Sequence, residues 1–267
     1  MKHALITAGH KGIGKKVTEQ FLKKQYSVTV HFRSDKNKVR ELQEEWHQYK
    51  DNVQFVEGDI TNKADIEHVV AQAMEQFGRI DVLINNAGPY VFERKKLIEY
   101  TDSEWYEMLE GNLSSVFHFV KAVVPIMKKQ QFGRVITYGF QDVEHTPGWM
   151  YRAAFSAAKS GLASLTKSLA LEVAEYGITA NMVCPGDIVG DMKENDIITA
   201  RLLEDKETPV GRSGTGEDIA RIIEFLCDEN SDMITGSIIS ASGGVNVFHK
   251  SKKQAPDVDA GACTLQQ

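Results

Sequence analysis

Residues 7–14 read Thr7-Ala8-Gly9-His10-Lys11-Gly12-Ile13-Gly14, and they connect a short apolar run, Ala4–Thr7, to a helical pattern over Lys15–Lys24. Glycines between a strand and a helix let the backbone turn tightly and approach a pyrophosphate, whose charge then lies at the helix N-terminus. The G-x-x-G-x-G spacing is a variant of the commoner dinucleotide fingerprint. A plain structural turn is the alternative, but the position between strand and helix favours a nucleotide-binding unit.

Short β-rich runs alternate with longer helical patterns along the rest of the chain. Strands are expected at Ala4–Thr7, Ser27–Phe32, Val53–Glu57, Val82–Asn85, Arg134–Tyr138, Thr179–Val183 and Ile238–Ala241. Helices are expected at Lys15–Lys24, Asn37–Tyr49, Lys63–Phe77, Ser103–Lys129 and Tyr151–Tyr176. Strands separated by helices need crossover connections, so they form a mostly parallel sheet with helices on both faces. The sequence predicts an α/β, single-domain Rossmann fold with a seven-stranded, doubly wound parallel sheet over residues 1–248, followed by a polar, flexible tail over 249–267.

The composition is that of an ordinary globular protein. Hydrophobic residues make up 42% of the 267 positions and charged residues 25%, which excludes a mostly disordered, collagen-like or disulfide-scaffold chain. The 31 basic residues are outnumbered by 37 acidic ones, giving a formal net charge of -6, and this balance argues against general nucleic-acid binding. Cys184, Cys227 and Cys263 are far apart, so they fit a reducing compartment and show no metal-ligand spacing.

No segment predicts export or membrane insertion. The first strand begins within a few residues of Met1, which leaves no room for the apolar region of a signal peptide. The most apolar later stretch, Val116–Met127, contains His118, Lys121 and Pro125 and falls short of the roughly 20 apolar residues that a membrane span requires. We therefore expect a cytoplasmic protein with no membrane partner, no nucleic-acid partner and no metal.

Two further motifs indicate chemistry only in combination. Asn85-Asn86-Ala87-Gly88 follows the expected strand Val82–Asn85, and alone it fits a strand-to-loop turn. Phe155 and Lys159 share one helix face at i, i+4 spacing, and alone they fit a core phenylalanine followed by a surface lysine.

Together with the glycine stretch, these motifs resemble the short-chain dehydrogenase/reductase (SDR) family, in order and from Lys2 to Val247. The other matching segments are Asp59-Ile60, Asn112, Pro185-Gly186-x-Ile188, Pro209–Gly214, Glu217–Ala220, Thr235-Gly236 and Ser242–Gly244. Within the family the chain is most similar to the 3-oxoacyl-[acyl-carrier-protein] reductase branch. That similarity implies a small-molecule or carrier-bound carbonyl substrate.

The resemblance also implies roles for individual residues. Asn112 would hold a water of a proton relay, and Lys159 would bind the nicotinamide ribose and supply positive charge. Cofactor binding falls on Gly9, Lys11, Gly12, Ile13, Gly14, Arg33, Asp59, Ile60, Asn86, Ala87, Gly88, Lys159, Pro185, Gly186 and Ile188.

Charge favours NADP(H) over NAD(H) as the cofactor. Arg33 occupies the position that in the family faces the adenosine 2′ group, and Lys11 lies inside the glycine stretch. A guanidinium suits a 2′-phosphate, whereas a carboxylate would suit bare ribose hydroxyls. A solvated surface pair is the alternative, and Asp35 lies close enough in the sequence to argue for NAD(H).

The family pattern breaks at the catalytic positions. The proton-donating tyrosine, four residues before the lysine, is replaced by Phe155, which has no proton to give. The serine that follows the fifth strand falls on Phe140 when counted forward from the strand and on Asp142 when counted back from Phe155. Gly190 stands where a threonine usually ends the Pro-Gly-x-Ile run.

Two functional hypotheses remain open. The first is an NADP-dependent reductase of a carbonyl compound with an atypical active site, which keeps Asn112 and Lys159. The candidate sources of its proton are the substrate itself and four side chains: Tyr151, Asp142, His145 and Tyr138. Tyr151 also fits an aromatic residue that packs at the pocket rim. The second hypothesis is a catalytically impaired NADP(H)-binding sensor or scaffold.

Two expectations concern surfaces. The segment Asp191–Glu207 follows Pro185-Gly186 and, by resemblance, closes over the substrate; its many acids argue against a strongly anionic substrate near the rim. Apolar stripes on the two longest helical patterns, together with the resemblance, predict a homodimer or homotetramer. The stripes comprise Leu113, Val116, Phe117, Val120, Leu162, Leu165 and Leu169. The alternative is that they face only the chain's own sheet.

Overall fold

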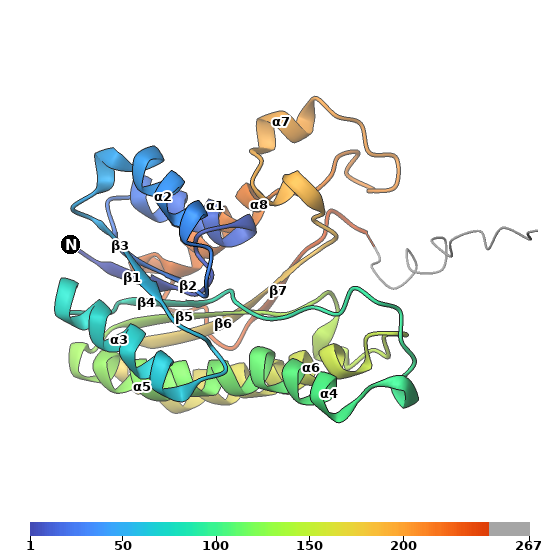
Figure 1. Cartoon of the computed structure of the whole chain (residues 1–267), viewed down its shortest axis with the longest axis horizontal. Coiled ribbons are helices and arrows are strands. Elements are labelled where there is room, and N and C mark those ends of the chain that lie inside the picture. Colours follow the sequence, from blue (N-terminus) through green and yellow to red (C-terminus); the bar gives the residue numbers. More distant parts are fainter. Residues whose placement is uncertain (246–267) are drawn as a thin grey trace, which may run out of the picture.

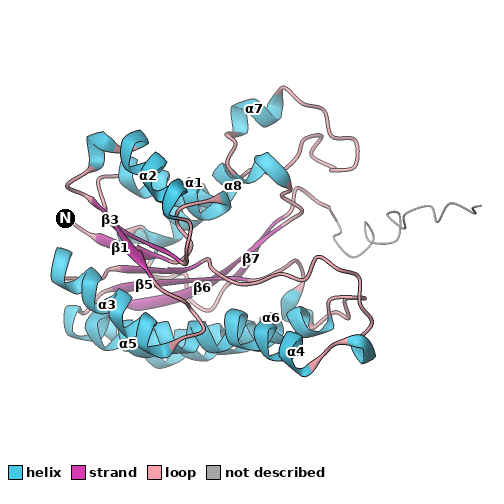
Figure 2. Cartoon of the chain, viewed as in Figure 1, coloured by secondary structure: helices cyan, strands magenta, loops and turns pink. Residues whose placement is uncertain are grey.

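The computed structural model describes residues 1–245 and contains one parallel sheet of seven strands (Figures 1 and 2). The strands are β1 (His3–Ile6), β2 (Ser27–Phe32), β3 (Val53–Glu57), β4 (Val82–Asn85), β5 (Gly133–Tyr138), β6 (Ile178–Pro185) and β7 (Ile238–Ala241). Their order in the sheet is β3-β2-β1-β4-β5-β6-β7. The order reverses between β1 and β4, and ligands of doubly wound sheets bind at the carboxyl ends of strands beside such a switch point.

Helices cover both faces of the sheet, as Figure 2 shows. One face carries α1 (Gly12–Lys23), α2 (Lys36–Glu45) and α8 (Gly216–Cys227), and the other carries α3 (Lys63–Phe77), α5 (Ser115–Gln130) and α6 (Ala153–Val173). Two shorter helices are α4 (Asp102–Leu109) and α7 (Ile197–Arg201). Ile6 packs in the core under α1 and α8, whereas its neighbour Leu5 packs in the core under α3 and α5. This alternation is expected of a strand buried on both faces.

The predicted α/β fold with a seven-stranded, doubly wound parallel sheet is confirmed. Four strands have the predicted bounds, namely Ser27–Phe32, Val53–Glu57, Val82–Asn85 and Ile238–Ala241. The boundary expected at residue 248 and the tail expected over 249–267 lie outside the described residues.

Some helix predictions need correction. The single helix expected over Ser103–Lys129 begins at Asp102, because Thr101 and Glu104 form a capping box. It is not continuous, since the π-helical segment Glu110–Ser114 separates α4 from α5. The helix expected over Asn37–Tyr49 ends at Glu45 and is followed by a short 3₁₀ turn. The sequence reasoning did not identify α7 or α8.

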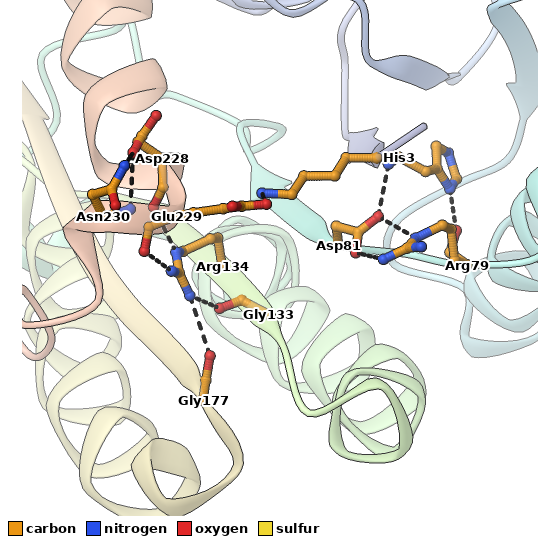
Figure 3. A network of polar contacts seen from close by, with 10 residues as sticks. His3, Arg79, Asp81, Gly133, Arg134, Gly177, Asp228, Glu229 and Asn230 are labelled. Atoms are coloured by element: carbon orange, nitrogen blue, oxygen red, sulfur yellow. Dashed lines mark hydrogen bonds and ion pairs between the residues drawn. The ribbon is translucent and has the colours of Figure 1, made fainter.

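A polar network fixes the amino ends of the strands, at the opposite edge from the switch point (Figure 3). The fully buried Arg134 guanidinium donates hydrogen bonds to the backbone carbonyls of Gly133, Gly177, Asp228 and Glu229 at 2.9–3.2 Å. Backbone carbonyls satisfy this buried cation, which is otherwise costly to desolvate. Arg134 therefore has a structural role that ties β5 and β6 to the end of α8.

The described helices and polar side chains were predicted to include no membrane span and no metal site. No helix among residues 1–245 is both long and apolar enough to cross a membrane. Within the same residues, no group of three or more His, Cys, Asp or Glu side chains is arranged to hold a metal ion.

Candidate cofactor and substrate site

The loop between β1 and α1 has a conformation that its glycine spacing only partly explains. Ala8 (φ +50°) and Gly12 (φ +57°) take the left-handed backbone conformation. Gly9 and Gly14 are needed for close packing instead. A Cβ on Gly9 would lie 2.9 Å from Thr18 Oγ1, and a Cβ on Gly14 would lie 2.3 Å from the Ala8 carbonyl oxygen. A non-glycine residue with this φ is strained, so Ala8 adopts its conformation at a cost.

Side chains from two neighbouring strands hold this loop. The Asn86 amide, just beyond β4, donates to the carbonyl oxygens of Thr7 and Ala8 at 3.0 and 3.2 Å. On β2, His31 Nδ1 accepts a hydrogen bond from the Ala8 backbone N–H at 3.3 Å, and its Nε2 donates to the Gly58 carbonyl at 2.8 Å. Burial lowers the pKa of His31, which fits this neutral tautomer. Asn86 therefore positions the loop, and His31 is a supporting residue that the sequence reasoning missed.

A cavity of about 590 Å³, here called the glycine-loop cavity, opens beside the loop at the carboxyl ends of β1, β2 and β4. Six residues expected to bind cofactor line it: Lys11, Arg33, Asp59, Ile60, Ala87 and Gly88. His10 also lines it, although the sequence reasoning did not select this residue. Burial lowers the pKa of His10 to about 4, and its Nδ1 has no hydrogen-bond partner among the described residues. A neutral imidazole nitrogen is therefore available to a ligand in this cavity.

Two cations, Lys11 and Arg33, line the glycine-loop cavity, together with four carboxylates, those of Asp35, Asp59, Glu107 and Glu110. Both cations are exposed, and neither forms an ion pair within residues 1–245. The Asp35 carboxylate caps α2 by accepting a hydrogen bond from the Lys38 backbone N–H at 3.1 Å. The Asp35 carboxylate is engaged as a helix cap. Its closeness to Arg33 in the sequence is therefore weak support for binding of the ribose hydroxyls of NAD(H).

A carboxylate already occupies one donor of the glycine loop. Glu194, after the 3₁₀ turn Gly190–Lys193, accepts a hydrogen bond from the Gly12 backbone N–H at 2.8 Å. Lys15 Nζ lies 3.8 Å from the same carboxyl group. The start of α1 therefore binds an anionic oxygen in this structure, as a helix N-terminus and a nearby cation favour. The loop has the donors that a pyrophosphate needs.

Asn112 lies in the π-helical segment that separates α4 from α5. Its amide nitrogen donates to the carbonyls of Pro89 and Met108 at 2.9 and 3.1 Å. Its side-chain oxygen is buried without a partner among the described residues, and a Cβ on Gly88 would come within 2.4 Å of it. Short π-helical turns occur frequently at functional sites, and this one leaves a buried acceptor directly behind the glycine-loop cavity.

Lys159 and Phe155 lie one turn apart on α6. Lys159 Nζ is 5.7 Å from the centre of the Phe155 ring, and the two residues are only 6% and 9% exposed. Burial lowers the pKa of Lys159 to about 8, because no carboxylate within residues 1–245 pairs with it. The nearby Cys184 thiol does not compensate, since burial raises its pKa to about 12. The ammonium faces an aromatic ring rather than a hydroxyl group.

A second cavity of about 490 Å³, here called the aromatic cavity, opens above Phe155. Its lining includes Pro185, Gly186 and Ile188, as expected for the nicotinamide end, and the rings of Tyr90, Phe92, Phe140, Trp149, Tyr151 and Phe155. Tyr90 lines both cavities, so they adjoin. The other residues predicted to bind cofactor line neither cavity: Gly9, Gly12, Ile13, Gly14, Asn86 and Lys159.

The structure separates the candidate proton donors. Phe140 lines the aromatic cavity, whereas Asp142 and His145 do not. The Tyr138 hydroxyl is buried in the core on the α1 and α8 side of the sheet, and burial raises its pKa, so Tyr138 is excluded as a donor to this cavity. Tyr151 is in the lining, with the Arg94 guanidinium 4.8 Å from its ring centre. Of the four side chains considered, Tyr151 alone reaches the cavity.

Comparison with known proteins supports a single family. A family model described as Enoyl-(Acyl carrier protein) reductase matches residues 7–246. The chain is 65% identical over 253 residues to YtkK of Bacillus subtilis (strain 168), provisionally named an oxidoreductase, with 94% of this chain and 99% of that protein covered. It is 36% identical to the 3-oxoacyl-[acyl-carrier-protein] reductase FabG of Haemophilus influenzae, with 91% and 98% covered.

Two solved structures also match the fold of this chain. A structure from Bacillus thuringiensis, provisionally called a 3-oxoacyl-reductase, matches with a TM-score of 0.88 and 58% identity, covering 93% of this chain and all of that one. ElxO with NADP bound matches with a TM-score of 0.79 and 30% identity, covering 91% and 98%. The fold, the glycine loop beside the switch point and these matches together show that the chain belongs to the short-chain dehydrogenase/reductase family.

Proposed function

We propose that the protein binds NADP(H) in the glycine-loop cavity and reduces a carbonyl compound, free or carrier-bound, in the aromatic cavity. When bound, NADPH supplies the hydride. The residues that would hold it are those of the glycine loop together with Arg33, Asp59, Ile60, Asn86, Ala87, Gly88, Lys159, Pro185, Gly186 and Ile188. The relative ElxO, solved with NADP bound, supports this assignment.

The preference for NADP(H) rests on Lys11 and Arg33, two exposed cations that line one cavity while Asp35 is engaged in capping α2. Calorimetry should show tighter binding of NADPH than of NADH, and Arg33→Asp should reverse the order. Arg40→Asp makes the same charge change at an exposed position of α2 outside the cavity lining, so it serves as the control. Equal affinities of the wild type for the two cofactors would refute the preference.

The proposal of an atypical active site rests on the Phe155 ring, which lines the aromatic cavity 5.7 Å from Lys159 Nζ. Lys159 keeps its role in binding ribose hydroxyls, and the buried Asn112 oxygen keeps its capacity to hold a water. The group that differs from the family pattern is the proton donor. A positioned general acid contributes about 10²–10⁴ in rate, so we expect slow reduction of simple ketones. NADPH oxidation against a panel of 3-oxoacyl thioesters, quinones, pteridines and aldehydes tests the proposal.

A second candidate function is an NADP(H)-binding sensor or scaffold without turnover. The observation that favours it is the replacement of both family hydroxyl groups by Phe155 and Phe140, whose rings lie 6.4 Å apart in the same wall. Tyr151 discriminates between the two functions. If its hydroxyl donates the proton, Tyr151→Phe abolishes NADPH oxidation but leaves NADPH binding unchanged. Tight NADPH binding with no oxidation of any panel compound would support the sensor.

We also propose a cytoplasmic location and, from the apolar side chains on the two longest helices, assembly into a homodimer or homotetramer. The expected stripe is only partly available for assembly. Val116, Leu162 and Leu169 are buried in the chain's own core, whereas Phe117 is 46% exposed.

A further inference from the structure

The aromatic cavity is built mainly from rings that contact one another. The Phe155 ring is 5.0 Å from Tyr90 and 6.1 Å from Trp149, both at near-perpendicular angles, and Trp149 is 5.1 Å from Phe140. Aromatic walls at these separations favour a flat, conjugated ligand, because ring faces and edges interact best with another π-system.

The charge at the rim of this cavity is positive. Arg94, Arg152 and Lys193 line it, against one carboxylate, Asp187. The Arg152 guanidinium donates to the Tyr90 hydroxyl at 3.1 Å and to the backbone carbonyls of Phe92, Glu93 and Tyr151 at 2.8–3.3 Å. All four acceptors are uncharged, and Arg152 forms no ion pair within the described part of the chain. Its charge is therefore available to an anionic ligand.

The acids of the covering segment do not cancel this charge. Glu194 is hydrogen-bonded to Gly12, and Asp196 pairs with Lys16 at 2.5 Å, so both carboxylates face α1. Neither they nor the other acids of 191–207 line the aromatic cavity. The acidity of this segment is therefore weak evidence against an anionic substrate in the aromatic cavity, since Glu194 and Asp196 contact α1 and none of its acids lines that cavity.

The lack of a hydroxyl beside Lys159 limits the product that this site can release. Reduction of a simple ketone leaves an alkoxide, whose basicity is comparable with that of hydroxide, since the pKa of water is about 15.7. Such a product needs an acid at the reacting oxygen. Reduction of a quinone leaves a phenolate instead, and a phenol has a pKa of about 10. A phenolate leaves the site without a positioned donor and takes its proton from water.

From the rings, the uncompensated guanidinium and the absence of an acid beside Lys159, we infer that the substrate is a planar conjugated dicarbonyl compound of the quinone class that carries an acidic substituent. The rings of Tyr90, Trp149 and Phe155 enclose its body, and Arg152 binds its anionic group. The reaction balances as quinone plus NADPH plus one proton from water, giving the hydroquinone and NADP⁺. This inference rests on the proposed function and names its substrate class.

Binding of two matched probes to the full-length protein with NADP⁺ tests the inference by calorimetry. Anthraquinone-2-carboxylate should bind at least tenfold more tightly than 2-methylanthraquinone, because only the carboxylate accepts a charge-assisted hydrogen bond from Arg152. Arg152→Gln should remove that difference, and Arg152→Lys should keep most of it. Equal affinities of the wild type for the two probes, or a loss with Arg152→Gln that affects both probes alike, would overturn the inference.

The rate of NADPH oxidation provides a second test of the inference. NADPH oxidation by the wild type should be faster with anthraquinone-2-carboxylate than with 4-oxocyclohexanecarboxylate, a non-aromatic ketone with the same charge. The opposite order would overturn the inference even if the probe binds. NADPH binding, measured separately, identifies which idea fails. Without NADPH binding the proposed function is wrong, whereas NADPH binding without anthraquinone-2-carboxylate binding leaves the proposed function intact and refutes only the substrate class.

Discussion

Glu194 and Gly12 are joined by a hydrogen bond, 2.8 Å from the Gly12 backbone nitrogen to a Glu194 carboxylate oxygen, although 182 residues separate them in the sequence. Gly12 belongs to the loop that would bind a cofactor pyrophosphate, and Glu194 belongs to the segment expected to cover the substrate. In this structure a side chain of the covering segment therefore occupies a donor that the cofactor would use.

This contact predicts that Glu194→Gln binds NADPH more tightly than the wild type. The substitution removes a negative charge that would compete with the pyrophosphate for Gly12 and Lys15. We expect a gain of several-fold, since an electrostatic contact at a helix N-terminus is worth roughly 0.3–1 kcal/mol. Calorimetric titration with NADPH measures it. Glu204→Gln, at an exposed position of the same segment, is the control, and equal gains from both variants would count against the contact.

Restoring the family's hydroxyl groups should create ordinary ketone reduction. Phe155→Tyr places a phenol one helical turn from Lys159, whose ammonium lowers the pKa of a neighbouring phenol. We expect at least a 10²-fold rise in NADPH oxidation with simple ketones, and a further rise when Phe140→Ser supplies a second donor. Phe140 is buried against Trp149, so thermal unfolding of both variants must be followed in parallel. A folded Phe155→Tyr protein without added ketone activity would contradict the assignment of position 155.

The pKa of Lys159 predicts a pH dependence of stability. The side chain is buried with a pKa near 8, below its ordinary 10.5. Between these values the unfolded chain holds a proton that the folded protein has released, so stability rises with pH in this window. The gain is at most about 3 kcal/mol. Denaturant unfolding at pH 7, 8, 9 and 10 should show this rise in the wild type relative to Lys159→Met. Parallel curves for the two proteins would show that Lys159 is not buried as an ammonium.

The left-handed conformation of Ala8 predicts a stabilising substitution. Ala8→Gly relieves backbone strain at φ +50°, and we expect the free energy of unfolding to rise by roughly 0.5–1 kcal/mol. Gly9→Ala provides the opposite test, because its Cβ would lie 2.9 Å from Thr18 Oγ1 and 3.2 Å from Ile6 Cγ2. Chemical denaturation measures both. If Gly9→Ala is tolerated better than Ala8→Gly, then Gly9 rather than Ala8 has the left-handed conformation.

The assembly prediction concerns the outer faces of α5 and α6. Phe117 on α5 is 46% exposed and Leu171 on α6 is 82% exposed, and large apolar side chains on adjacent helices are typical of an interface between subunits. Light scattering at micromolar concentration should give a mass of two or four chains of 29.8 kDa. Phe117→Glu combined with Leu171→Glu should reduce it, whereas Met233→Glu, at another exposed apolar position, should not. A monomeric wild type would refute the prediction.

The sequence predicted the sheet because its strands are short, buried and separated by helices. Nine of the residues that it predicts to bind cofactor line the two adjoining cavities, since they follow strands whose carboxyl ends meet at one edge of the sheet. Spacing could not show that Ala8, rather than Gly9, takes the left-handed conformation. That result depends on contacts with Thr18 and Ile6 from other elements.

Two features of the site lay beyond sequence reasoning for physical reasons. The sequence Glu110–Ser114 contains no proline and no other signal that marks the π-helical segment, so the pattern predicts one continuous helix there. The choice between Phe140 and Asp142 depended on how the loop after β5 folds. A short 3₁₀ turn, Val143–His145, follows this loop, and Phe140 lines the aromatic cavity whereas Asp142 does not.

Tyr90 lines the glycine-loop cavity and the aromatic cavity at once, and its hydroxyl accepts a hydrogen bond from Arg152. A ligand that turns this ring in one cavity alters the wall of the other. Any resulting change in affinity is reciprocal, because the coupling free energy between two sites is the same in both directions. The dissociation constant of either ligand therefore has a defined meaning only when the occupancy of the other cavity is stated.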